Sequence, residues 1–136
     1  MSSRGRKALR IYGGTFWRCR NKDYLSFPKS LAVRARIRRD LRPILKSNGF
    51  TPVRIIFVNY GAGSGPGTVV PLTESTFVLG AWPEQNGSIE FFLHYCGEGK
   101  EEGAMQLAKD LRLVLQSRKF TPSPLTFMGP EIFTYV

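Results

Sequence analysis

At the centre of the chain stands Leu72-Thr73-Glu74-Ser75-Thr76-Phe77-Val78-Leu79-Gly80-Ala81-Trp82-Pro83-Glu84, followed twelve residues after Glu84 by Cys96-Gly97. The apolar run from Ser75 to Trp82 predicts a buried strand that ends at the Pro83 break. Asn86-Gly87 is a strong hairpin signal, and it joins this strand to a second one at about Ser88–Tyr95. The sequence therefore predicts an antiparallel hairpin at the heart of the fold.

Further strands are expected on both sides of this hairpin. Val53–Tyr60 is β-branched and apolar, and a flexible glycine-rich turn over 61–67 separates it from a strand over Thr68–Leu72. An N-terminal strand is expected over Ala8–Trp17, and its Gly13-Gly14 pair predicts a bulge or a close approach by another backbone. The residues of this strand expected near the core are Leu9, Ile11 and Tyr12. The tail, Phe120–Val136, is expected to add a short last strand.

Two helices are predicted. The first begins at Ser26-Phe27-Pro28, because serine caps helices and proline fits the first turn, and it runs to about Lys46, where Asn48-Gly49 supplies the stop. Pro43 is expected to kink its last turns. Its apolar stripe is Leu31, Ile37, Leu41, Ile44 and Leu45. The second helix is expected over Glu101–Ser117, with Met105, Ala108, Leu111 and Leu115 at helical spacing.

The order β-α-β-β-β-α-β favours the α+β class, as a two-layer sandwich in which an antiparallel-rich sheet carries both helices on one face. The 136 residues are expected to form a single domain over 8–136 after a basic N-terminal tail over 1–7. No apolar run is long enough to span a bilayer, and no secretory signal is recognised. Cys19 and Cys96 form neither a disulfide framework nor a metal set, so a cytoplasmic protein without metal is expected.

Charge is distributed unevenly along the chain. The net charge is +10, and residues 1–54 hold fifteen Lys and Arg against Asp23 and Asp40. Such asymmetry is typical of a protein that binds nucleic acid or an acidic partner, and equally of a solvated helix face with a loose basic tail. Both interpretations remain open.

Familiar catalytic motifs are lacking. The glycine-rich turn over 61–67 has no Lys-Ser/Thr and opens no helix, so it is not a P-loop, and a flexible connection is expected there. His94 is the only histidine, and it lies in an apolar strand, where a satisfied structural histidine is expected. Nothing in the sequence places His94 near a serine, so a hydrolytic triad is not predicted.

The central segment nevertheless resembles that of the small bacterial and archaeal S-adenosylmethionine decarboxylase proenzymes. That family has Glu-Ser-His, three residues, then His-x-Trp-Pro-Glu, and further on a strand ending in Cys-Gly. Here the same frame gives Glu74-Ser75-Thr76, Phe77-Val78-Leu79, Gly80-Ala81-Trp82-Pro83-Glu84 and then Cys96-Gly97. The layout of strands and helices matches over roughly residues 8–117.

The resemblance implies that the chain cleaves itself between Glu74 and Ser75 and converts Ser75 into a pyruvoyl group. This group takes up electrons while carbon dioxide leaves S-adenosylmethionine, a step of polyamine synthesis. By the same resemblance Cys96 returns a proton to the product, and Glu84 binds the ribose hydroxyls. Tyr60 stacks on adenine, Trp82 packs at the substrate site, and a homodimer or other small oligomer is implied.

Three positions depart from the family pattern. Gly80 and Thr76 stand where the family has histidines, and Phe92 stands where an acidic residue is expected. His94 is not expected to replace the missing base, because it lies on another strand, two residues from Cys96. Three functions therefore stay open: a pyruvoyl-dependent decarboxylase, an unprocessed lyase that cleaves S-adenosylmethionine, and a non-catalytic adenosyl- or nucleic-acid-binding protein.

Overall fold

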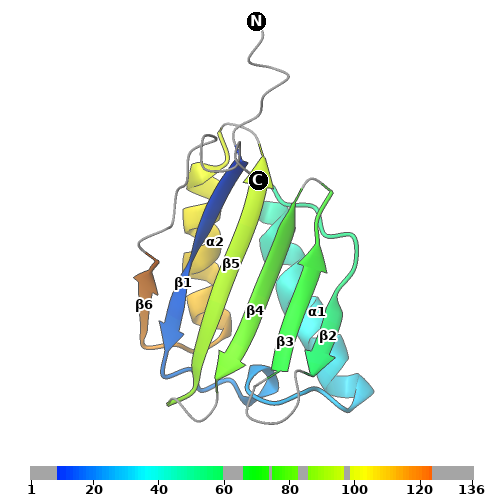
Figure 1. The fold of residues 1–136 in the computed structure, drawn as a ribbon. Helices are drawn as coiled ribbons and strands as arrows, with labels where there is room; N and C mark the ends of the chain where they lie inside the picture. The colour runs from blue at the N-terminus through cyan, green and yellow to red at the C-terminus, as the bar shows by residue number, and fades with distance from the viewer. Residues whose placement is uncertain (1–8, 60–65, 74, 83–85, 97–98, 124–136) are drawn as a thin grey trace, which may run out of the picture.

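A computed structural model of the protein describes residues 9–59, 66–73, 75–82, 86–96 and 99–123 (Figure 1). Its strands are β1 (Leu9–Trp17), β2 (Ile56–Asn59), β3 (Pro66–Pro71), β4 (Thr76–Trp82), β5 (Ser88–Cys96) and β6 (Lys119–Pro122). Its helices are the short 3-10 helix η2 (Lys22–Tyr24) and the α-helices α1 (Leu31–Ser47) and α2 (Glu101–Val114).

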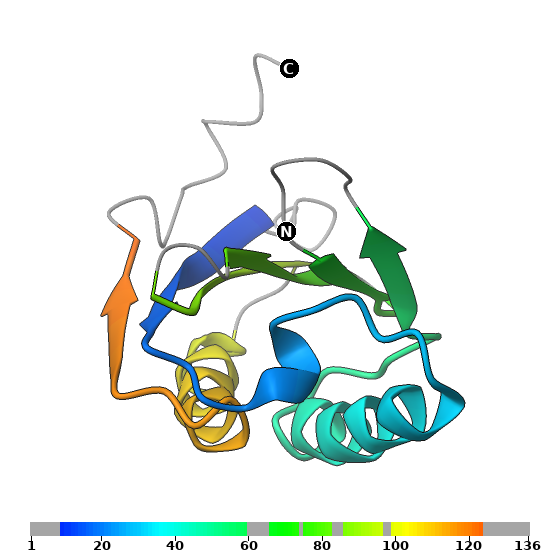
Figure 2. The same cartoon turned by 90° about the horizontal axis from the view of Figure 1, so that it is seen from below.

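The six strands form one sheet in the order β2-β3-β4-β5-β1-β6, and every neighbouring pair is antiparallel. Both α-helices lie against the same face of this sheet (Figure 2). The predicted α+β sandwich is confirmed, including the central hairpin of β4 and β5 and the short last strand. Pro66 and Gly67, expected in the glycine-rich turn, instead pair with β2 as the start of β3.

Alternation along the strands separates the two faces of the sheet. In β4 and β5 every second side chain is buried against the helices. The buried set is Phe77, Leu79, Ala81, Ile89, Phe91, Leu93 and Tyr95, and it packs with Ile37, Leu41 and Leu45 of α1 and Leu107 and Leu111 of α2. The opposite face is covered by no helix among the described residues, and Phe92 is 43% exposed there. We call it the open face.

The glycine pair of β1 marks a close approach of backbones. The β1–β5 register runs without interruption from Leu9 to Phe16, so the bulge alternative is wrong. A Cβ at Gly13 or Gly14 would stand 2.3 Å from a carbonyl oxygen of β5 or β6, which only glycine allows. Tyr12 is buried in the core as predicted, whereas Ile11 lies on the open face, because neighbours in a strand alternate.

The predicted start of α1 is wrong by four residues. Ser30, and not Ser26, caps the helix, since its Oγ accepts a hydrogen bond from the Val33 N–H at 3.1 Å. Leu31 is 79% exposed and does not belong to the apolar stripe. The helix continues through Pro43 and ends at Asn48-Gly49 as predicted, with Gly49 at φ +92°.

The kink expected at Pro43 stays a prediction. The second helix, α2, ends at Val114, three residues before the predicted end. Ser117 lies beyond it because its hydroxyl donates a hydrogen bond to the Trp17 carbonyl at the end of β1. The tail over 1–7 lies outside the described residues, so the proposed domain boundary also stays a prediction.

Candidate active site at the head of strand β4

Ser75 stands immediately before β4, in a turn closed by the Leu72 N–H, which donates to the Ser75 carbonyl at 2.9 Å. Its Oγ is buried and has no hydrogen-bond partner among the described residues. Leaving a buried hydroxyl unpaired costs about 1–3 kcal/mol, and such groups in folded proteins call for an explanation. A hydroxyl kept free of partners is one that can react or bind a ligand.

Two further buried polar atoms that lack a hydrogen-bond partner among the described residues lie in the same cross-strand row. Within the described residues the set is Ser75 Oγ, Tyr95 OH and Arg10 Nε. Arg10 of β1 pairs with Tyr95 of β5. On the other side of β5, the last β4–β5 pair is Thr76 with His94, so Ser75, one residue earlier, lies beside Tyr95. The Arg10 Nε lies 3.6 Å from the Glu101 Oε2, so an ion pair flanks the row. Among the described residues the row therefore offers two hydroxyls without a hydrogen-bond partner and one ion-paired guanidinium at one end of the sheet.

Tyr95 is the most deeply buried member of this row, at 1% exposure. The pKa of its phenol is raised to about 12, mainly by burial and also by the Glu101 carboxylate, while the Arg10 guanidinium opposes the rise. Tyr95 therefore keeps its proton at neutral pH and can donate a hydrogen bond to a ligand placed beside Ser75.

Replacing Tyr95 by Phe is expected to raise the free energy of unfolding by about 1 kcal/mol at pH 7, because an unpaired buried hydroxyl is removed. The matched control is Tyr24→Phe: that phenol donates to the Asp40 Oδ2 at 3.1 Å, so its removal should destabilise by about 1 kcal/mol. Urea unfolding at pH 7 measures both. Equal destabilisation by the two changes would contradict the absence of a partner at Tyr95.

The free energy of unfolding should also depend differently on alkaline pH in the wild type and in the Tyr95→Phe variant. The unfolded phenol ionises near its ordinary pKa of about 10, and the folded one near about 12. The contribution of Tyr95 is therefore fully present below pH ~10 and is lost as the pH rises towards ~12. The Tyr95→Phe variant should lack this part of the alkaline loss of stability.

His94 lies on the open face at the same end of the sheet, within β5 as predicted. It is exposed, and its imidazole has no hydrogen-bond partner in the described part of the chain. Its register partners are Thr76 of β4 and Ile11 of β1. Directly opposed residues have Cα atoms about 4.5–5.5 Å apart. The only imidazole thus stands across from the residue that follows Ser75.

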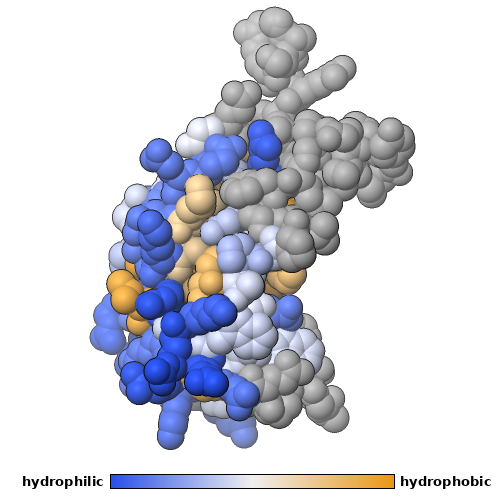
Figure 3. Space-filling view, turned by 90° about the vertical axis from the view of Figure 1, so that its left-hand side faces the viewer, coloured by the Kyte–Doolittle hydropathy of each residue, from blue (hydrophilic) through white to orange (hydrophobic). Residues whose placement is uncertain are grey.

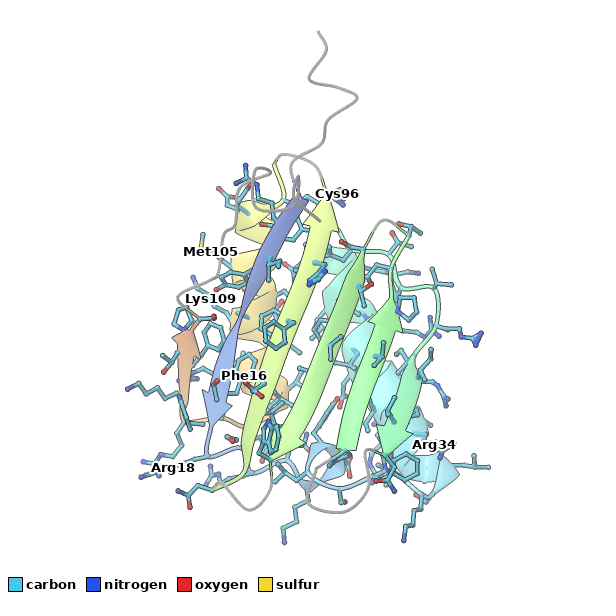
Figure 4. The ribbon with its side chains drawn as sticks, viewed as in Figure 1. Phe16, Arg18, Arg34, Cys96, Met105 and Lys109 are labelled. Atoms are coloured by element: carbon cyan, nitrogen blue, oxygen red, sulfur yellow. The ribbon has the colours of Figure 1, made fainter. Side chains whose placement is uncertain are left out.

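Cys96 belongs to the same end of the sheet (Figure 4). It follows His94 on the same face of β5, its thiol is free, and it is partly buried. The β4–β5 register places Ser75, His94 and Cys96 at one end of the sheet, two of them as predicted site residues and His94 as an addition. The Ser75 side chain lies on the helix-covered face with Tyr95, whereas His94 and Cys96 lie on the open face. The signal that could have found His94 is the register itself, which the sequence does not fix.

Trp82 is not brought to this cluster within one chain. Seven residues of extended chain separate it from Ser75, about 23 Å at 3.3 Å per residue. Its indole Nε1 donates to the Glu90 Oε1 at 2.7 Å. Gly80, the register partner of Glu90, has open space where a Cβ would stand. Within the described residues, the far end of β4 therefore holds a partly buried pair, Trp82 and Glu90, that is separate from Ser75.

Three predicted site residues, Tyr60, Glu74 and Glu84, lie outside the described residues and stay predictions, as does the glycine-rich stretch over 61–65. In the described ranges no three His, Cys, Asp or Glu side chains gather as they would around a metal ion. Cys19 and Cys96 are both free. No described helix is long and apolar enough to cross a membrane.

Comparison with solved structures identifies the fold. The chain is similar to the adenosylmethionine decarboxylase from Aquifex aeolicus VF5, with a TM-score of 0.60 and 14% sequence identity over 86% of this chain and 87% of that one. No protein-family model matches the sequence. No curated protein sequence matches it. The protein therefore has the fold of an adenosylmethionine decarboxylase, and the likeness lies in the structure.

Proposed function

We propose that this protein, which shares the fold of adenosylmethionine decarboxylases, acts as a lyase on S-adenosylmethionine at the N-terminal end of β4. The observation that carries the proposal is the buried, unpartnered hydroxyl of Ser75 at the position where the family has its reactive serine. The proposed setting is polyamine synthesis in the cytoplasm. Two free cysteines are in keeping with a reducing compartment.

The free hydroxyl fits the family's self-made cofactor. In the proposed processing, Ser75 Oγ attacks the carbonyl carbon of Glu74, the peptide C–N bond breaks, and an ester forms. A base then removes the Cα proton of residue 75 while the Cβ–Oγ bond breaks, which releases residues 1–74 as a carboxylic acid. Water replaces the nitrogen left on residue 75, and ammonia departs. The resulting pyruvoyl group supplies an electron sink for loss of carbon dioxide.

His94 is the proposed base of this processing. A base is required near the Cα of residue 75, and general base catalysis contributes about 10²- to 10⁴-fold. Gly80 cannot serve, because it has no side chain. His94 lies opposite Thr76, and its exposed imidazole has no hydrogen-bond partner among the described residues. In this proposal His94 takes the place of the missing histidine and acts on the Cα proton from the open face, while the Ser75 side chain lies on the helix-covered face.

The remaining residues have binding roles in this proposal. Tyr95 donates a hydrogen bond to the substrate, and Cys96 returns a proton to the product carbon. Tyr60 stacks on adenine, and Glu84 accepts hydrogen bonds from the ribose hydroxyls. Trp82 packs against the substrate, and Glu74 contributes the carbonyl at which the chain is cut.

A second copy of the chain belongs to the proposal, because Trp82 lies too far from Ser75 to share one substrate with it in a single chain. Two copies packed through their open faces about a two-fold axis would bring the Trp82 end of one sheet to the Ser75 end of the other. The open face is apolar enough for this: Phe92 is 43% exposed, and Val58, Val69 and Val78 are apolar residues of the neighbouring strands.

Phe92→Lys is expected to weaken the homodimer at least tenfold, because a charge would be buried at the centre of the interface. Analytical ultracentrifugation across a dilution series measures the dissociation constant. The control is Leu113→Lys on α2, which is 71% exposed and lies on the helix side of the sheet. A wild-type protein that is monomeric at high concentration, or equal effects of the two changes, would refute the open-face dimer.

A second reaction needs no processing, and it is favoured by the loss of both family histidines, at whose positions stand Thr76 and Gly80. Without processing, the carboxylate oxygen of S-adenosylmethionine can attack its own γ-carbon. The C–S bond then breaks, and the sulfur keeps the electron pair, which gives methylthioadenosine and a lactone. The sulfonium is already a good leaving group, so the site needs only to orient the substrate.

One incubation separates the two reactions. Purified protein is given S-adenosylmethionine labelled in its carboxyl carbon, and labelled carbon dioxide and methylthioadenosine are both measured. Release of labelled carbon dioxide supports the decarboxylase. Methylthioadenosine with retained label supports the lyase without a built cofactor. Neither product, with no shift in melting temperature on adding substrate, would refute action on S-adenosylmethionine.

A further inference from the structure

A second polar site lies at the opposite end of the sheet from Ser75. It is a pocket of about 350 Å³ lined by Trp17, Arg18, Asn86, Arg118 and Lys119. Figure 4 labels Arg18 at this end of the sheet, away from Cys96. Figure 3, which looks onto one side of the molecule, shows strongly hydrophilic residues gathered at the lower end of that side. The proposed lyase reaction uses none of the residues that line the pocket.

Hydrogen bonds hold the aromatic wall of this pocket in place. The Trp17 indole, 39% exposed, donates from Nε1 to the Thr121 Oγ1 at 3.0 Å. The Trp17 carbonyl accepts from the Arg118 N–H at 3.0 Å and from the Ser117 hydroxyl at 2.8 Å. The buried Ser117 hydroxyl also accepts from the Lys119 N–H at 3.2 Å. An exposed ring with a fixed orientation is a preformed surface for stacking.

The backbone at Arg18 is strained in a way that presents its side chain. Arg18 has φ +53°, in the left-handed region where residues with a Cβ cost of order 1–3 kcal/mol. The bonds on either side hold it there: the Arg118 N–H to the Trp17 carbonyl, and the Cys19 N–H to the Gly87 carbonyl at 3.0 Å. Strain that neighbouring contacts maintain is frequent at binding sites.

The charge of the pocket is not neutralised. Arg18, Arg118 and Lys119 form no ion pair within the described ranges, and no described carboxylate lines the pocket. Three cations beside an exposed indole match a phosphate next to a nucleobase, because cations bind phosphate and the ring face stacks on the base. We infer that this pocket binds one nucleotide of a single-stranded nucleic acid.

A single-stranded nucleic acid fits this pocket better than a duplex or a free nucleotide does. A duplex keeps its bases stacked on each other, so Trp17 would find no free face. A free nucleotide would gain nothing from the rest of a chain that carries a net charge of +10. Arg20 is a further exposed cation near the pocket, and its backbone N–H donates to the Leu115 carbonyl at 3.2 Å. Arg20 therefore extends the basic surface beyond the pocket.

The test is the binding of fluorescein-labelled twelve-nucleotide DNA and RNA strands, followed by anisotropy over a range of salt concentrations. In the pocket variant, Arg18, Arg118 and Lys119 are all replaced by Gln. The control variant replaces the exposed Arg39, Lys46 and Lys109 by Gln and so removes the same charge from the two α-helices. Trp17→Ala and Trp17→Phe test the ring, and circular dichroism confirms that each variant folds.

The pocket variant is expected to lower the slope of log K against log salt by about 0.7, since the pocket holds one phosphate and each phosphate contact contributes about 0.7 on single strands. Trp17→Ala should weaken binding about 5- to 150-fold, and Trp17→Phe much less, because stacking of one base is lost only in the first. Equal behaviour of the pocket and control variants would overturn the site. The site would also be overturned if a mononucleotide or a duplex bound as tightly as the twelve-nucleotide single strand. Failure of the single strand to bind at low salt would overturn it as well.

Discussion

A Ser75→Ala chain is expected to remain one uncut polypeptide and to release no carbon dioxide from S-adenosylmethionine. The change removes the oxygen that attacks the Glu74 carbonyl, so neither the ester nor the pyruvoyl group can form. Loss of a nucleophile lowers turnover by about 10⁶-fold in well-studied enzymes, and an effect on this scale is expected here. Intact mass and labelled carbon dioxide are the two measurements.

Folding has to be separated from chemistry in this experiment. The Ser75→Ala chain should be at least as stable as the wild type, because the hydroxyl that it lacks is buried without a partner. Thr73→Ala in the same turn is the control, since this residue is exposed. If the Ser75→Ala chain were cut, or turned over substrate at the full rate, Ser75 would have no part in the reaction. Retained methylthioadenosine formation in the uncut chain would favour the alternative lyase.

The second large effect is expected at His94. His94→Ala should slow self-processing about 10²- to 10⁴-fold, because the only imidazole near Ser75 is lost. Added imidazole should restore part of the rate, which a purely structural role would not allow. The measurement is the fraction of cut chain over time, followed by mass spectrometry, in protein refolded from denaturant.

A control variant on the open face tests whether slower processing is specific to the loss of His94. Thr15→Val changes a partly buried residue at the other end of the open face, where it pairs with Glu90, and it should leave processing unchanged. If His94→Ala processes at the wild-type rate, the base lies elsewhere. A loss that imidazole does not reverse would likewise argue against proton transfer by His94.

Most of the fold follows from local patterns. Apolar residues at alternate positions in Thr76–Trp82 and Ser88–Cys96 predict a sheet with one buried face. Apolar residues at helical spacing in α1 and α2 predict the helical layer that covers this face. The start of α1 was missed because two serines, Ser26 and Ser30, compete as caps in the sequence. Only the hydrogen bond from the Val33 N–H to Ser30 decides between them.

The site is less predictable because it depends on register between strands. A two-residue turn at Asn86-Gly87 would set Thr76 opposite residue 97, whereas the longer connection over 83–87 sets it opposite His94. The buried row of Arg10, Tyr95 and Ser75 joins three segments that are distant in the sequence. No spacing rule predicts such a row, since pairing between distant strands is set by the packing of the whole sheet.

The central claim is that the Ser75 hydroxyl cuts the chain, and the intact mass of freshly purified wild-type protein tests it most directly. Two fragments are predicted, residues 1–74 and residues 75–136, the second lighter by one ammonia than a fragment with an N-terminal serine. A single species at the full mass of 15.3 kDa would contradict the claim.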